Sequence, residues 1–172
     1  MQSLNTLKTR LAKAKTSLIL EHPFVGSIAL GMPHTYQEGI GTACTNGKRV
    51  LYDPKFVSGL TDDELKFLVA HECMHPMLEH NFRRQSREPK RWNRAADYVI
   101  NQLLVDEGIG KFIEGGCLDK ALYDAGNGVS EHIYTLIPDG DGGGDGDMGG
   151  TGQDLEDGEG TAQDQAQQSS EW

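Results

Sequence analysis

The chain of 172 residues has few cysteines, no long apolar run and no excess of basic residues. Its three cysteines, Cys44, Cys73 and Cys117, are widely spaced and form no C-x-x-C pair, which argues against a disulfide framework and favours a reducing cytoplasm. The N-terminus lacks the apolar segment of an export signal, and no run of about 18 apolar residues occurs. We therefore expect a cytoplasmic protein that does not cross a membrane.

The net negative charge of the chain comes entirely from the C-terminal segment. The formal net charge is −10, from 26 acidic and 16 basic residues. Residues 139–172 hold 10 of the acidic residues, 10 of the 22 glycines and no Lys or Arg, which leaves 16 acidic and 16 basic residues in 1–138. Asp/Gly-rich sequence buries too little apolar surface to offset its ordering entropy. We predict one domain over 1–138, an acidic flexible tail or linker over 139–172, and no nucleic-acid binding.

The segment His71-Glu72-Cys73-Met74-His75 matches the H-E-x-x-H pattern. Two histidines four residues apart lie on the same side of a helix, so both imidazoles can reach one zinc ion, and Glu72 is placed to take a proton from a metal-activated water. The Thr61–Glu64 stretch has the pattern of a capping box and predicts the start of this helix. Pro76 predicts a kink, or the end of the regular helix, directly after His75.

A catalytic zinc usually has three protein ligands, so the two histidines need a partner. Asp97 is the candidate, because it stands in an otherwise apolar helical run, where a lone carboxylate is costly to bury. The alternative for Asp97 is an ion pair with Arg83, Arg84 or Arg94. His80 is the rival ligand, but it lies roughly 140° around a straight helix from His75 and would need the Pro76 kink or a helix end to turn it back. We expect instead a surface or outer-sphere role for His80.

Other segments predict both helices and strands. The apolar periodicity predicts helices over about 4–20, 65–79, 92–104 and 130–136. Residues 24–30 look like a strand, and residues 41–45 and 48–52 predict a hairpin around Asn46-Gly47. Cys73 should face the core, and Asn93 and Asn101, one turn from Asp97, are candidates to hydrogen-bond the ligands or the substrate.

These motifs, above all Trp92-Asn93-Arg94-Ala95-Ala96-Asp97-Tyr98-Val99-Ile100-Asn101, resemble the metallopeptidase domain that precedes a von Willebrand factor A-like domain in bacterial and phage proteins. The resemblance covers about residues 5–138. It implies a zincin-like α+β fold, in which a small antiparallel or mixed sheet packs on the H-E-x-x-H helix and a second ligand-bearing helix, with an N-terminal helix. It also implies zinc on His71, His75 and Asp97, and Glu72 as the catalytic residue.

The resemblance leads us to expect a zinc-dependent peptidase acting on protein or peptide substrates, with Glu72 as general base. In such proteins an acidic, Gly-rich linker usually leads to the second domain, so a von Willebrand factor A-like domain or another protein is an expected partner of the tail. The alternative is a non-catalytic zinc-binding scaffold whose acidic tail tethers a partner.

Overall fold

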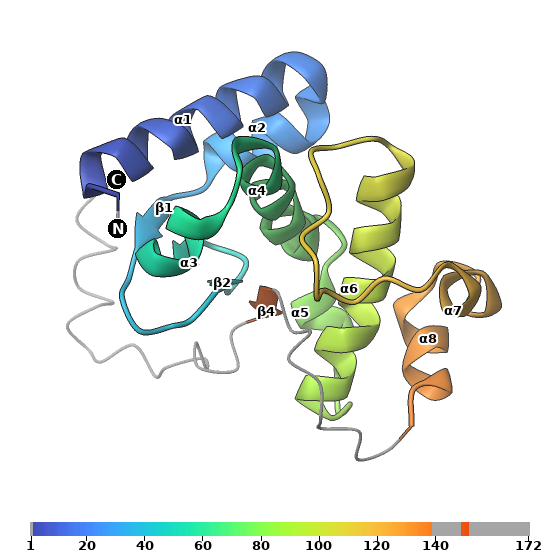
Figure 1. The fold of residues 1–172 in the computed structure, drawn as a ribbon. Coiled ribbons are helices and arrows are strands. Elements are labelled where there is room, and N and C mark those ends of the chain that lie inside the picture. Colours follow the sequence, from blue (N-terminus) through green and yellow to red (C-terminus); the bar gives the residue numbers. More distant parts are fainter. Residues whose placement is uncertain (1, 139–148, 152–172) are drawn as a thin grey trace, which may run out of the picture.

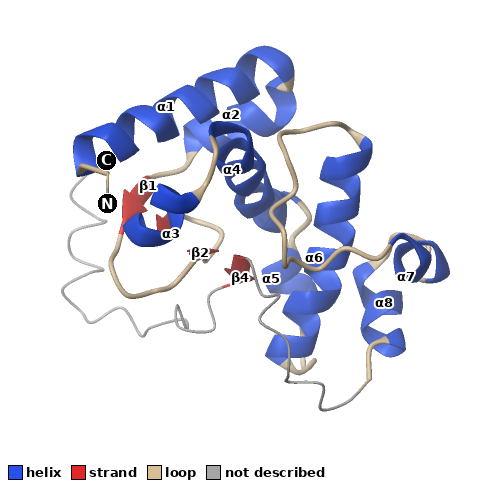
Figure 2. Ribbon diagram, in the orientation of Figure 1, coloured by secondary structure: helices blue, strands red, loops and turns tan. Residues whose placement is uncertain are grey.

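The computed structural model describes residues 2–138 and 149–151, which form an α+β structure made mostly of helices (Figures 1 and 2). The predicted α+β class is confirmed. In chain order the elements are α1 (Leu4–Glu21), α2 (Pro23–Gly31), β1 (His34–Tyr36), β2 (Ala43–Thr45), β3 (Val50–Tyr52), α3 (Pro54–Gly59), α4 (Asp62–Met77), α5 (His80–Arg83), α6 (Pro89–Asp106), α7 (Lys120–Ala125), α8 (Ser130–Leu136) and β4 (Gly149–Thr151).

The first two helices form a corner that packs on α4. The predicted first helix is confirmed, with Leu7, Leu11, Ala14 and Leu18 buried along one face of α1. The predicted strand over residues 24–30 is wrong, because this segment is helix α2, with Pro23 at its first turn. A short apolar run is ambiguous between strand and helix, and packing against α1 decides for the helix.

The sheet is small and mixed, with strand order β1-β3-β2-β4. The predicted hairpin is confirmed, since β2 and β3 pair antiparallel around the turn at Asn46 and Gly47. β1 pairs with β3 in parallel, so β3 is central and has a neighbour on both edges. β4, a strand that we did not expect within the predicted tail, pairs with β2 in parallel. The remainder of that tail, and the flexibility expected of it, lie outside the described residues.

Helices α4 and α6 contact each other and carry the predicted site. The capping box at the start of α4 is confirmed: the Glu64 amide donates to the Thr61 hydroxyl (3.2 Å), and the Thr61 amide donates to the Glu64 carboxylate (2.8 Å). The predicted helices around 92–104 and 130–136 correspond to α6 and α8. Cys73 is fully buried in the core, as predicted.

Within the part of the chain that the structure describes, no helix combines the length and the apolar character that a bilayer crossing demands.

Gly26 permits the close approach of α2 to α1. A Cβ atom built at this position would lie 2.3 Å from the Ile19 Cα atom, whereas one at Gly31, in the same helix, meets nothing within 4 Å. We predict that Gly26→Ala lowers the free energy of unfolding by about 1–3 kcal/mol through overpacking. The matched control Gly31→Ala should leave it unchanged or raise it slightly. Thermal or urea unfolding measures both, and equal effects would contradict this packing.

Candidate metal centre

Two helices bring three potential metal ligands together. His71 and His75 lie one turn apart on α4, and Asp97 comes from the middle of α6. The Nε2 atoms of His71 and His75 are 3.2 Å apart, and Oδ1 of Asp97 lies 3.4 Å from the first and 3.3 Å from the second. Three potential ligand atoms therefore form a nearly equilateral triangle.

The triangle is buried, and its side chains determine each other's charge. Asp97 and His75 are fully buried and His71 is 1% exposed. Burial opposes ionisation of Asp97, but its interactions with His71 and His75 together outweigh burial and lower the pKa of the carboxyl. Burial likewise opposes protonation of His71, but its interactions with Asp97, Glu72 and Asn101 together outweigh burial and raise the pKa of His71 to about 9. His75 is neutral, because burial lowers its pKa.

The outer nitrogen of His71 is held by Asn101, one turn beyond Asp97 on α6. The amide Nδ2 of Asn101 donates to the carbonyl oxygen of Cys117 (2.8 Å), which directs its Oδ1 atom toward Nδ1 of His71, also at 2.8 Å. Nδ1 of His71 must therefore donate, because an amide oxygen only accepts. The expectation that Asn101 hydrogen-bonds a candidate ligand is confirmed.

His80 holds the outer nitrogen of His75, as Asn101 holds that of His71. Helix α4 continues through Pro76 to Met77, and Glu79 then takes a left-handed conformation (φ 55°) that turns the chain back. Nδ1 of His80 consequently meets Nδ1 of His75 at 3.2 Å, on the side of that imidazole away from Asp97. His80 is thus an outer-sphere residue rather than a member of the triangle.

Two further contacts fix the orientation of His80. Its Nε2 atom lies 3.1 Å from the hydroxyl of Ser130 at the start of α8, and the indole N–H of Trp92 donates to its carbonyl oxygen (2.9 Å). Burial lowers the pKa of His80 to about 2, so this histidine stays neutral. A neutral His80 can accept at Nδ1 and donate at Nε2, which suits a His75 that keeps the lone pair of Nε2 for a metal ion.

Glu72 is fully buried beside the triangle. Its charge acts on His71, where it helps to raise the imidazole pKa, and on Tyr52 of β3, where it adds to the effect of burial. A carboxylate between the H-E-x-x-H helix and the sheet therefore contributes to the negative potential of the site.

The donor set fits a metal ion. Neither carboxylate oxygen of Asp97 has a hydrogen-bond partner of normal geometry among the described residues. A buried carboxylate is stable only when paired or bound to a cation. Two imidazole nitrogens and one carboxylate oxygen, each within 3.4 Å of the other two, are ligands that divalent transition metals accept.

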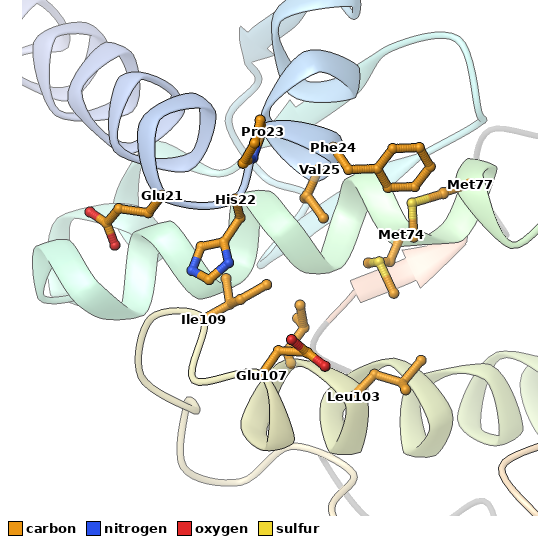
Figure 3. Close-up of a pocket in the computed structure, with 11 residues that line it drawn as sticks. Glu21, His22, Pro23, Phe24, Val25, Met74, Met77, Leu103, Glu107 and Ile109 are labelled. Atoms are coloured by element: carbon orange, nitrogen blue, oxygen red, sulfur yellow. The ribbon is translucent and has the colours of Figure 1, made fainter.

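The three residues of the triangle are not among those that line the nearby apolar cavity of about 410 Å³ (Figure 3). That cavity lies at the α1–α2 corner, between Met74 and Met77 of α4 and Leu103 and Leu104 of α6. Its walls are mainly apolar, so it suits an apolar group and offers little for chemistry. The candidate chemistry lies on the neighbouring face of α4.

The fold and this cluster define an α+β domain with a buried His-His-Asp group suited to a metal ion. Residues 6–171 match the family model described as "Putative metallopeptidase domain", and the chain belongs to this family. No curated protein and no solved structure gives a significant match.

The three candidate metal ligands were predicted from the sequence, whereas several residues that orient them were not. The structure brings together the three predicted ligands, and among the described residues Asp97 makes its ionic contacts with the two histidines rather than with an arginine. Sequence reasoning missed the part of Ser130, Trp92 and the Cys117 carbonyl in orienting the imidazoles. The sequence holds no signal for Ser130, which lies 50 positions from its partner His80.

We predict that Asn101→Ala destabilises the protein by about 1–3 kcal/mol, because it leaves the His71 N–H and the Cys117 carbonyl buried without their partner. Gln102→Ala is the control, since the side chain of Gln102 bonds Asp106, one turn further on the same helix, and no other residue within the described part of the chain. Urea unfolding of both variants measures the difference. A loss for Asn101→Ala no larger than that of the control would contradict the proposed network.

Proposed function

We propose that this chain is a zinc-dependent metallopeptidase domain, with zinc on His71, His75 and Asp97 and with Glu72 as general base. The observation that carries the proposal is the ligand triangle, with edges of 3.2, 3.3 and 3.4 Å. A tetrahedral zinc ion with bonds of about 2.0–2.1 Å keeps its ligand atoms about 3.3–3.4 Å apart. The three ligand atoms lie at separations that suit zinc, and a tetrahedral ion bound to them would have a fourth position for water.

Zinc in such a site supplies a Lewis acid that polarises the peptide carbonyl and lowers the pKa of a water molecule. Glu72 follows His71 directly on α4, and its carboxylate is the base that takes the proton from the attacking water. Glu72 then returns this proton to the leaving amine. With a metal ion bound, His71 and His75 would both be neutral ligands, and Asn101 and His80 fix the orientation of the two rings through their outer nitrogens.

The wider setting is part of the same proposal. A zincin-like arrangement is supported by the position of α4, which contacts β2 on one side and α6 on another. The substrate would be a protein or peptide, because the family is described as one of peptidases. A reducing cytoplasm is consistent with the free thiols of Cys44, Cys73 and Cys117. The sequence resemblance supports a von Willebrand factor A-like domain as a partner of the tail.

One observation favours a second candidate, a zinc-binding scaffold without catalysis. His71, Glu72, His75 and Asp97 are each at most 1% exposed, and structural zinc sites are closed whereas catalytic sites keep an accessible position. The two candidates differ in one measurable property, peptide hydrolysis that depends on Glu72.

We predict one zinc ion per chain, measured by elemental analysis of the purified protein. Asp97→Ala should weaken zinc binding by more than the roughly 10–100-fold that loss of an outer hydrogen-bond partner costs. Asp106→Ala, on the same helix but exposed, is the control and should bind zinc as the wild type does. Zinc should also raise the unfolding temperature of the wild type, and a chelator should reverse this. Undiminished zinc affinity in Asp97→Ala would remove Asp97 from the ligand set.

We predict that Glu72→Gln retains zinc and loses peptide hydrolysis by about 10²–10⁴-fold, because the amide cannot accept the proton of the attacking water. Casein and the chain itself are the substrates to test, by mass spectrometry of the products. Glu79→Gln, outside the triangle on the exposed end of the same segment, is the control and should retain hydrolysis. A zinc-loaded wild type that cleaves neither substrate would favour the scaffold.

A further inference from the structure

Basic side chains gather in the turn before α6 and in the first turn of that helix. Residues 83–94 hold six of the 16 basic residues of the chain and one acidic residue, whereas the rest of residues 1–138 holds 10 basic and 15 acidic residues. The acidic residue, Glu88, caps α6, where its carboxylate accepts the amide N–H groups of Lys90 and Arg91. We refer to Arg84, Arg87, Lys90 and Arg91 as the basic turn.

Three cations of the basic turn form no ion pair within the part of the chain that the structure describes. Arg84 and Lys90 are exposed to solvent. Arg87 donates to the carbonyl oxygens of Arg83 (2.9 Å) and Arg84 (3.3 Å), and its guanidinium lies 5.2 Å from the centre of the Trp92 ring. These uncharged partners hold the guanidinium in place without neutralising its charge.

The start of α6 adds to the positive potential. The backbone N–H groups of a helix N-terminus carry partial positive charge, so cations in the first turn are unfavourable and anions are favourable. Lys90 and Arg91 both lie in this turn, and Tyr134 of α8 holds the guanidinium of Arg91 4.4 Å from its ring centre. In Figure 1, α8 lies beside the lower half of α6, the half that begins at Pro89. A ligand with several carboxylates would relieve the repulsion at this point.

An exposed aromatic side chain lies next to the basic turn. Phe82 of α5 is 85% exposed, more than any other large apolar side chain among the described residues. It precedes Arg84 by two positions, so an apolar contact and several cations are available to one ligand. The ligand that complements this surface is an acidic peptide segment with an apolar residue among its carboxylates.

The chain itself holds such a segment after β4. Residues 154–159 read Asp-Leu-Glu-Asp-Gly-Glu, with four carboxylates, one leucine and no basic residue, and they lie outside the described residues. β4 contacts α6 and ends at Thr151. Eight extended residues span up to roughly 26–29 Å, about the length of an 18-residue helix such as α6. From β4, residues 154–159 can therefore reach the start of α6.

We propose that the basic turn and Phe82 form a docking surface for residues 154–159 of the same chain, with Leu155 against Phe82 and the four carboxylates against the cations. The proposal requires neither zinc nor catalysis, so it stands apart from the proposed function. Each exposed ion pair contributes little and is screened by salt, so docking depends on several pairs at once. A segment of the same chain binds at high effective concentration, which makes weak contacts sufficient.

Carbodiimide cross-linking of the full-length protein tests this contact, because the reagent joins a lysine to a carboxylate only where the two groups meet. We expect Lys90 to couple to residues 154–159 at least ten times more often than Lys55, an exposed lysine of α3 that serves as the control. Peptide mapping by mass spectrometry measures both products. The Lys90 product should form within the monomer, and about 0.5 M NaCl should reduce it several-fold. Equal yields from the two lysines, or a product found only between two copies, would overturn the proposal.

Variants at exposed positions test the surface itself. Phe82→Ala and Arg84→Glu should each lower the yield of the Lys90 product at least three-fold, because one removes the apolar contact and the other reverses a charge. Phe24→Ala, which changes a 69% exposed phenylalanine of α2, is the matched control and should leave the yield unchanged. Urea unfolding shows that each variant is folded. Unchanged yields in both variants would exclude this surface as the docking site.

A basic surface also attracts nucleic acid, and a binding assay separates that occupant from the acidic segment. The full-length protein in which residues 154–159 carry Asn and Gln in place of their four Asp and Glu side chains has an unoccupied basic turn under the proposal. It should bind a fluorescein-labelled peptide of sequence QDLEDGEG, which corresponds to residues 153–160, at least several-fold more tightly than the wild type by fluorescence anisotropy. It should bind a single-stranded oligonucleotide of about 20 thymidines more weakly than this peptide. Equal peptide affinity in the two proteins, or tighter binding of the oligonucleotide, would refute the choice of occupant.

Discussion

The site depends on one constraint, the placement of a carboxylate where water cannot solvate it. Asp97 is fully buried, and two imidazoles, of which only that of His71 is charged, lie 3.3–3.4 Å from its carboxylate. Removing a carboxylate from water costs several kcal/mol even after relaxation, and one imidazolium offsets only part of that cost. A divalent cation at the centre of the triangle would offset far more. The packing of α6 against α4 is therefore the feature of the fold that brings this carboxylate to the two histidines.

The turn at Glu79, helix α8 and the loop that contains Cys117 orient the two imidazoles of the site. The left-handed turn at Glu79 brings His80 against His75, and Ser130 of α8 orients His80 in turn. The loop that contains Cys117 holds Asn101, and through it His71. Each imidazole thereby has its outer nitrogen bonded and its inner nitrogen directed at the same point. Residues 78–138 thus do more than complete the core, since they determine which nitrogen of each ring faces Asp97.

The sequence allowed prediction of the parts of the site with local causes. The capping box at Thr61, the i,i+4 spacing of the histidines and the misfit of Asp97 in an apolar helix are all readable over a few residues. The helix α2 was mistaken for a strand because its apolar run has no clear period, and contact with α1 across Gly26 decides its form. The strands β1 and β4 were missed because each has three residues and is stabilised by partners distant in the chain. The contact of His80 with His75 required a helix end and a left-handed residue that no local pattern predicts.

The buried Glu72 bears on the choice between scaffold and enzyme. A structural metal site needs its ligands and the groups that orient them, and His71, His75, Asp97, Asn101 and His80 already meet that need. A further carboxylate buried beside them adds negative charge in a region where charge is costly to desolvate. The cost of burying Glu72 is explained if this carboxylate transfers protons during a reaction. A site that only stabilises the fold gives no such explanation.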